Sequence, residues 1–114
     1  MQLATLDEDG WELDDGELSH LKYPETFWIP ERSKRWTLQG GQLVKLMFRI
    51  GLRDTTGKET EEVERMWVIV ERQVEPGLYV GVLDNDPYCT REMRSGIQVV
   101  FEPRHVIQIS GDDA

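Results

Sequence analysis

Hydrophobic and polar positions alternate along the chain after residue 42, and this alternation predicts β-strands. In residues 43–50, every second side chain is apolar, and basic side chains occupy two of the positions between them. Successive side chains of a strand point to opposite faces of a sheet, so this segment is expected to be half-buried. The face expected to be buried comprises Val44, Leu46, Phe48 and Ile50.

Four further segments carry strand signals. Residues 62–74 are rich in β-formers and apolar on both faces at their centre, which favours a central strand or a covered second face. Residues 78–83 form the next predicted strand, in which Gly81 indicates a bulge or a close approach of another chain segment. Residues 97–101 and 106–109 are short apolar runs bounded by turn residues.

Five strands with short connections are typical of small barrels and strongly bent antiparallel sheets. The predicted fold is therefore mostly β: a small five-stranded antiparallel barrel-like sheet of SH3-like character, with an acidic N-terminal arm. The arm is expected over residues 1–20, a single β-rich domain over 21–111 and a tail over 112–114. The polar residues 51–61 are expected to form a loop.

The segment before the first predicted strand has weaker signals. Two prolines bracket the aromatic run 23–30, and the residue before a proline is disfavoured in the helical region. This run is interpreted as an edge strand or as a plug on the core. Residues 31–36 are expected to form one helical turn.

Charge is concentrated at the N-terminal end of the chain. The net charge of the 114 residues is −9, and residues 1–31 contain nine acids and one base, which leaves thirteen acids and twelve bases for residues 32–114. An acidic strip repels phosphate backbones, so direct binding of nucleic acid is not expected. The strip is interpreted either as a solubilising segment or as an electrostatic lure for a basic protein partner.

Composition and cysteine content bear on the cellular location of the protein. The hydrophobic fraction is 39% and the charged fraction 31%, and no apolar run approaches the ~20 residues that span a bilayer. No membrane association and no signal peptide are expected, because the N-terminus lacks a basic and apolar leader pattern. With Cys89 as the single cysteine, no intramolecular disulfide can form, and a cytoplasmic location is predicted.

The sequence contains no recognisable catalytic, cofactor-binding or metal-binding pattern. A zinc site needs three or four cysteines and histidines at characteristic spacing, whereas this chain has one cysteine and two scattered histidines. The segment that follows residue 83 is instead rich in turn-forming residues, and a tryptophan lies in the middle of the predicted strand 62–74. The candidate interaction surface predicted from it comprises Trp67, Asp84, Asn85, Asp86, Pro87 and Tyr88.

Three segments together resemble a known family. They read ERMWVIV at 64–70, YVGVLDNDP at 79–87 and GIQVVF at 96–101. In these motifs residues 43–109 resemble an uncharacterised bacterial domain-of-unknown-function family, number twenty-three fourteen in its usual listing. The resemblance implies a bacterial origin and a compact β-rich domain, and it carries over no activity and no catalytic residue.

Two hypotheses for function follow. The first is a non-catalytic protein-binding or regulatory module that uses the acidic strip and the candidate interaction surface. The alternative is a small ligand-binding barrel or enzyme in which the turn 84–87 acts with His105 or Cys89. The alternative requires these side chains to converge in one pocket.

Overall fold

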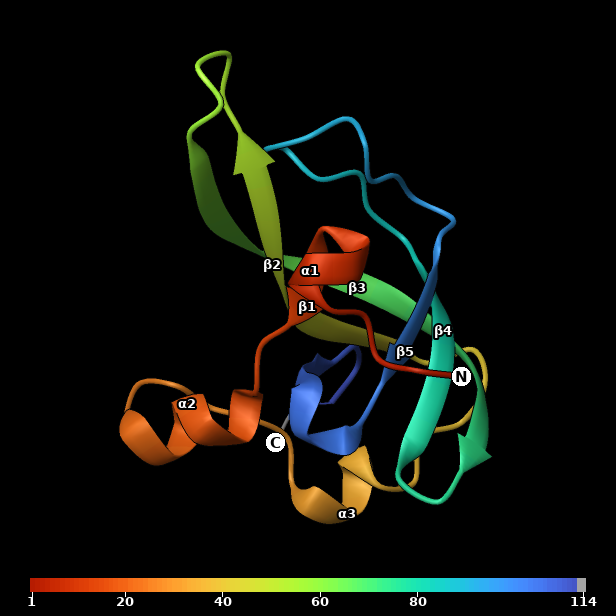
Figure 1. The fold of residues 1–114 in the computed structure, drawn as a ribbon. Helices are drawn as coiled ribbons and strands as arrows, with labels where there is room; N and C mark the ends of the chain where they lie inside the picture. The colour runs from red at the N-terminus through yellow and green to blue at the C-terminus, as the bar shows by residue number, and fades with distance from the viewer. Residues whose placement is uncertain (113–114) are drawn as a thin grey trace.

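The computed structural model describes residues 1–112, so the predicted tail lies outside the described residues except for Asp112. Six strands and four short helices are present in this part of the chain (Figure 1). In chain order they are α1 (Leu6–Asp9), β1 (Trp11–Leu13), α2 (Gly16–Lys22), α3 (Arg32–Arg35), β2 (Leu43–Arg53), β3 (Glu59–Glu75), β4 (Leu78–Leu83), β5 (Gln98–Phe101), the 3-10 helix η1 (Pro103–His105) and β6 (Val106–Ile109).

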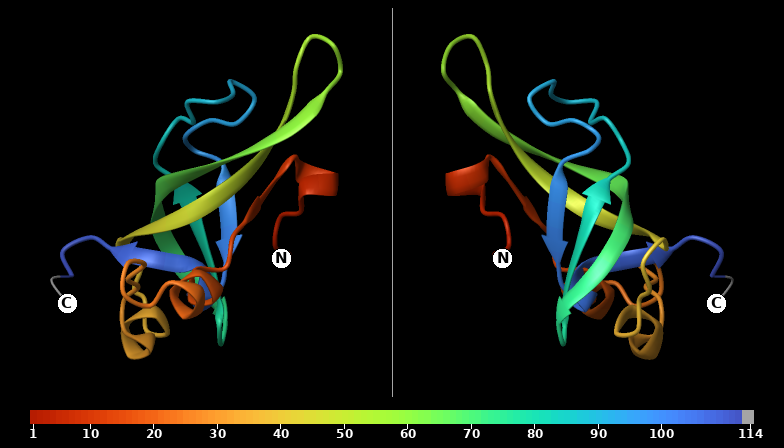
Figure 2. Two further views of the ribbon diagram at one scale, coloured as in Figure 1. Left: turned by 90° about the vertical axis from the view of Figure 1, so that its left-hand side faces the viewer. Right: turned by 90° about the vertical axis from the view of Figure 1, so that its right-hand side faces the viewer.

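The strands form one strongly curled antiparallel sheet. Strands β2 to β5 pair in chain order, and β6 returns after η1 to pair with β2. Figures 1 and 2 show how the sheet bends into a half-barrel. The mostly-β, barrel-like prediction is therefore confirmed, and each of the five predicted strands corresponds to one of β2 to β6.

The core lies on the inner side of the curled sheet. All four apolar side chains of the predicted buried face of β2 are buried, and the rings of Tyr79 and Phe101 stack with their centroids 5.5 Å apart. Trp11 of β1 packs on Phe48 at a centroid distance of 5.4 Å. The buried core of the sheet also includes Met66, Val68, Val70, Leu83, Val99, Val106 and Ile109.

The hairpin of β2 and β3 is longer than predicted and projects from the body of the sheet (Figure 2). Residues 51–61 were expected to form a loop, but pairing continues to Arg53 opposite Glu59. The prediction was wrong because it relied on apolar alternation. This end of the hairpin extends beyond the core, so both of its faces carry polar side chains.

Gly81 lies where two strands approach closely, as predicted. A Cβ atom at this position would overlap the carbonyl oxygen of Ile69 and would lie 2.7 Å from Cγ1 of Val68. The register of β3 and β4 shifts between Val70 and Arg72, directly beside this point. Only glycine therefore fits between the strands without displacing backbone.

The N-terminal segment contributes to the sheet. Residues 1–20 contain α1, β1 and most of α2, and β1 pairs with β2 through Trp11 opposite Ile50. Three residues are too few to show a period, which explains why β1 was missed. The predicted helical turn corresponds to α3, whereas residues 23–30 contain no strand, so the edge-strand interpretation was wrong.

The helices are all short. The longest described helix, α2, has seven residues, so none of the helices in residues 1–112 could cross a bilayer.

Candidate functional site

The predicted turn and Trp67 do lie together. Asn85 accepts a hydrogen bond from the backbone N–H of Trp67 through Oδ1 at 2.6 Å. The N–H of Asp84 donates to the carbonyl oxygen of Trp67 at 2.9 Å. These two bonds fix the start of the loop 84–97 against β3.

Most polar groups of this turn serve the loop itself. Asp86 accepts a hydrogen bond from the N–H of Ser95 at 2.9 Å, and Pro87 is buried. The carboxylate of Glu64 accepts the N–H groups of the two residues after Pro87. Asp84 and Tyr88 are among the exposed residues of the turn. Because the hydrogen bonds above occupy most of the other polar groups, the candidate interaction surface has few free polar groups, and it stays a prediction.

Cys89 has an environment that opposes nucleophilic chemistry. Burial, together with the hydrogen bond and the negative charge of Glu64, raises the pKa of the Cys89 thiol to about 12. A nucleophilic cysteine needs the opposite, a lowered pKa in positive surroundings. The groove that includes Cys89 has neither Asp84, Asp86 nor His105 in its lining.

His105 lies in the protein interior. It is part of η1, and its Nδ1 accepts a hydrogen bond from the N–H of Glu102 at 2.9 Å. Burial, with the nearby charge of Arg104, lowers the pKa of His105 to about 4. The imidazole is therefore neutral at pH 7 and stabilises the turn between β5 and β6.

The lowered pKa of His105 predicts a loss of stability on acidification. Between pH 6.5 and 4 the unfolded chain binds a proton at this residue that the folded chain does not, so stability falls as the pH falls. From pH 7 to 5 the free energy of unfolding should decrease by about 2 kcal/mol through this group. Urea unfolding at both pH values checks this, and His105→Gln should flatten the difference. An unchanged pH dependence in that variant would contradict the assignment.

A groove opens at the end of the half-barrel from which the β2–β3 hairpin and the loop 84–97 project. Its volume is about 730 Å³, within the range typical of ligand sites. We call it the mouth groove. It is lined by Leu6, Asp7, Gly10, Gly51, Leu52, Arg53, Glu59, Thr60, Glu61, Cys89, Thr90 and Glu92.

The mouth groove is acidic. Four carboxylates line it, together with a single guanidinium, that of Arg53, which is ion-paired with Glu59. Glu61 pairs with Arg49 at 3.2 Å, whereas Asp7 and Glu92 form no ion pair among residues 1–112. A polar groove with uncompensated carboxylates favours a cationic ligand over an anionic one.

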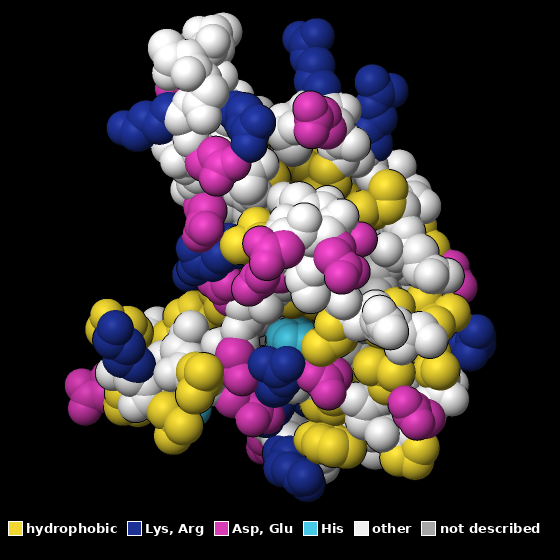
Figure 3. Space-filling view, viewed as in Figure 1, with side chains coloured by type: hydrophobic (Ala, Val, Ile, Leu, Met, Phe, Trp, Pro, Cys, Tyr) yellow, Lys and Arg dark blue, Asp and Glu magenta, His cyan; other side chains and the backbone are white. Residues whose placement is uncertain are grey.

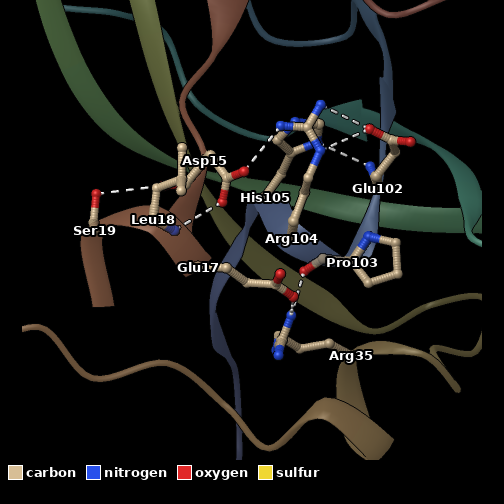
Figure 4. Close-up of polar contacts among 9 residues, drawn as sticks. All are labelled: Asp15, Glu17, Leu18, Ser19, Arg35, Glu102, Pro103, Arg104 and His105. Carbon is tan, nitrogen blue, oxygen red and sulfur yellow. Dashed lines mark hydrogen bonds and ion pairs between the residues drawn. The ribbon is translucent and has the colours of Figure 1, made fainter. Parts of the chain in front are cut away.

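A polar network fixes α2 to the body of the protein (Figure 4). The buried guanidinium of Arg35 donates to Glu17 at 2.5 Å and to the carbonyl oxygens of Pro30 and Pro103 at 2.8 and 3.0 Å. Arg104 bonds to Asp15, the N-cap of α2, at 3.1 Å. These contacts join α2, the loop before α3 and η1.

No metal site is formed by the described part of the chain. Residues 1–112 contain no group of three or more histidine, cysteine, aspartate or glutamate side chains placed to hold an ion. The mouth groove left no signal in the sequence. The groove is built by residues distant in sequence that only the curled sheet brings together.

Comparison of the chain with protein-family models, curated proteins and solved structures gives no match. The resemblance in residues 43–109 stays a prediction.

Proposed function

We propose that the chain is a non-catalytic binding module whose mouth groove takes a lysine- or arginine-rich segment of a protein partner. The observation that carries this proposal is the lining of the groove, in which four carboxylates accompany one ion-paired guanidinium. Acidic walls around a groove attract cations and exclude polyanions. Nucleic acid is accordingly not among the ligands we propose, and neither is a membrane.

The charge of the N-terminal segment supports the same partner. Of the nine acids in residues 1–31, three form ion pairs with arginines: Asp14, Asp15 and Glu17. The other six form no ion pair among the described residues. These six are the unpaired residues of the acidic strip: Asp7, Glu8, Asp9, Glu12, Glu25 and Glu31. Uncompensated surface charge accelerates encounter with an oppositely charged partner.

The environment of Cys89 and His105 favours a binding role over the enzymatic alternative. One group is a thiol with a raised pKa, and the other is a neutral imidazole enclosed by the fold. Neither is poised to exchange a proton with a substrate near pH 7. A cytoplasmic setting and a bacterial source remain part of the proposal, on the grounds of the single cysteine and the sequence resemblance.

The acidic lining should determine both affinity and salt dependence. Asp7 and Glu92 are exposed, and their side chains make no hydrogen bond among those of the described residues, so D7N/E92Q removes charge without removing structure. A fluorescein-labelled octalysine peptide should bind this variant about fivefold to tenfold more weakly than the parent chain. Fluorescence anisotropy at low and moderate salt measures the effect, and the salt dependence should decrease.

The matched control is E71Q/E75Q, which removes the same charge from exposed sites of β3 outside the groove. It should change the affinity less than twofold. Equal weakening by both variants would show attraction to net charge alone and would reject the groove as the site. Deletion of residues 1–20 is a poorer test, because it also removes β1 from the sheet and Glu17 from Arg35.

A further inference from the structure

Large apolar side chains are exposed on α2 and on the loop that follows it. Leu18 and Leu21 are 64% and 75% exposed, and side chains three residues apart lie on one side of a helix. Tyr23 and Trp28 are 52% and 76% exposed. Figure 3 shows hydrophobic side chains gathered over α2. We call Leu18, Leu21, Tyr23 and Trp28 the α2 patch.

The structure holds this patch in a defined position. Gly16 is buried at the start of α2, where a Cβ atom would lie 2.8 Å from Cγ2 of Ile107 and 3.2 Å from the carbonyl oxygen of Arg104. His20 is hydrogen-bonded to the carbonyl oxygen of Phe27 at 2.6 Å, which ties the helix to its loop. The contacts of Arg35 and Asp15 described above fix the same helix, so the patch is not a frayed end.

The aromatic side chains are also oriented. The indole N–H of Trp28 donates to the carbonyl oxygen of Glu25 at 3.1 Å, which leaves the ring mostly in solvent. The ammonium of Lys22 lies 5.4 Å from the centroid of the Tyr23 ring. Exposed Trp and Tyr side chains with fixed orientations are the residue types that dominate binding energy at protein interfaces.

Charge around the patch indicates which partner covers it. Glu25 lies within the patch loop and Glu31 just after it, and neither forms an ion pair among residues 1–112, whereas the cations of Lys22 and Arg65 lie over the rings of Tyr23 and Phe27. Figure 3 shows further acidic side chains at the position of α1, on the same face of the molecule. A second copy of this chain would bring another net charge of −9 to this face and would be repelled. A basic partner with an apolar side is complementary to both features.

We infer that the α2 patch anchors an amphipathic cationic helix of the partner, with its apolar side on the patch and its basic side toward the acidic strip. This inference rests on the proposed function and names the form of the partner segment. Apolar and aromatic anchors supply affinity that charge alone does not provide. A cationic segment without an apolar side should therefore bind more weakly.

Two probes of equal charge test the inference. One is a Leu/Lys peptide with its leucines at helical spacing, and the other replaces every leucine with serine. The parent chain should bind the Leu/Lys peptide at least tenfold more tightly than the Ser/Lys peptide in fluorescence anisotropy. The variant L21S/W28S should reduce this advantage below about threefold and leave the affinity for the Ser/Lys peptide unchanged. Circular dichroism checks that L21S/W28S is folded. If it is not, the single variant W28S takes its place in the same comparison.

The control V63S/I69S removes two exposed apolar side chains of β3, away from the α2 patch, and should retain the full preference for the Leu/Lys peptide. The inference is overturned if L21S/W28S prefers the Leu/Lys peptide as strongly as the parent chain does, or if the parent chain binds both peptides with the same affinity. Concentration-dependent dimerisation in sedimentation that L21S/W28S abolishes would assign the patch to a second copy and also overturns it. The proposal that the mouth groove binds the cationic segment is tested separately. It fails if D7N/E92Q and the parent chain bind the Ser/Lys peptide with equal affinity.

Discussion

Substitution of Gly81 by alanine should lower the free energy of unfolding by about 3 kcal/mol. The new Cβ atom would overlap the carbonyl oxygen of Ile69, which belongs to the backbone of β3 and cannot move without breaking the strand pairing. The strands would have to separate next to the register shift. Urea unfolding followed by tryptophan fluorescence measures the change.

Gly51→Ala is the matched control for this prediction. Gly51 also lies in a strand, β2, but a Cβ atom there would meet its nearest neighbours at ordinary contact distances of 3.5 and 3.6 Å. Its substitution should leave stability unchanged or slightly increased, because alanine reduces the conformational entropy of the unfolded chain. If both variants unfold at the same urea concentration, the close approach of β3 and β4 at Gly81 is not present in solution.

Replacement of Arg35 by methionine should cost about 2 kcal/mol. Arg35 is only 5% exposed, and its guanidinium donates hydrogen bonds to Glu17, Pro30 and Pro103. Methionine would leave all three acceptors without this donor. The cost is below the 3–5 kcal/mol typical of a broken buried ion pair, since the Glu17 side chain is 41% exposed and can bind water instead. Thermal unfolding by circular dichroism measures it.

Arg53→Met is the corresponding control on the hairpin. Arg53 and Glu59 form an ion pair in which both side chains are largely exposed, so its loss should change stability by less than about 0.5 kcal/mol. Equal destabilisation by both substitutions would show that Arg35 does not hold α2 as the structure indicates.

R35M should also lose the tenfold preference for the Leu/Lys peptide, because the α2 patch would no longer be held in place.

The sheet could be predicted from the sequence because its strands cover a core on one side. Val44 and Phe48 are buried at alternate positions of β2, and Gly81 marks the point where two strands meet. The pattern failed where burial does not follow a period. β1 is only three residues long, and the polar hairpin around Arg53 extends beyond the core.

The candidate sites were harder to predict, for a physical reason. Asn85 and Asp86 were predicted to belong to an interaction surface, but the structure shows both accepting backbone N–H groups, from Trp67 of β3 and from Ser95 of the loop 84–97. The mouth groove joins Asp7 to Glu92, which are 85 positions apart in the sequence. No local motif records such a juxtaposition. The exposure of Leu21 depends on how Arg35 orients α2, which also involves distant residues.

Titration of the 15N-labelled chain with the Leu/Lys peptide, followed by NMR, tests the binding role most directly. The proposals predict that the resonances that shift are those of Asp7, Glu61 and Glu92 in the mouth groove and those of Leu21 and the Trp28 indole in the α2 patch. Shifts confined to Asp84–Tyr88, or the absence of any saturable shift, would contradict them.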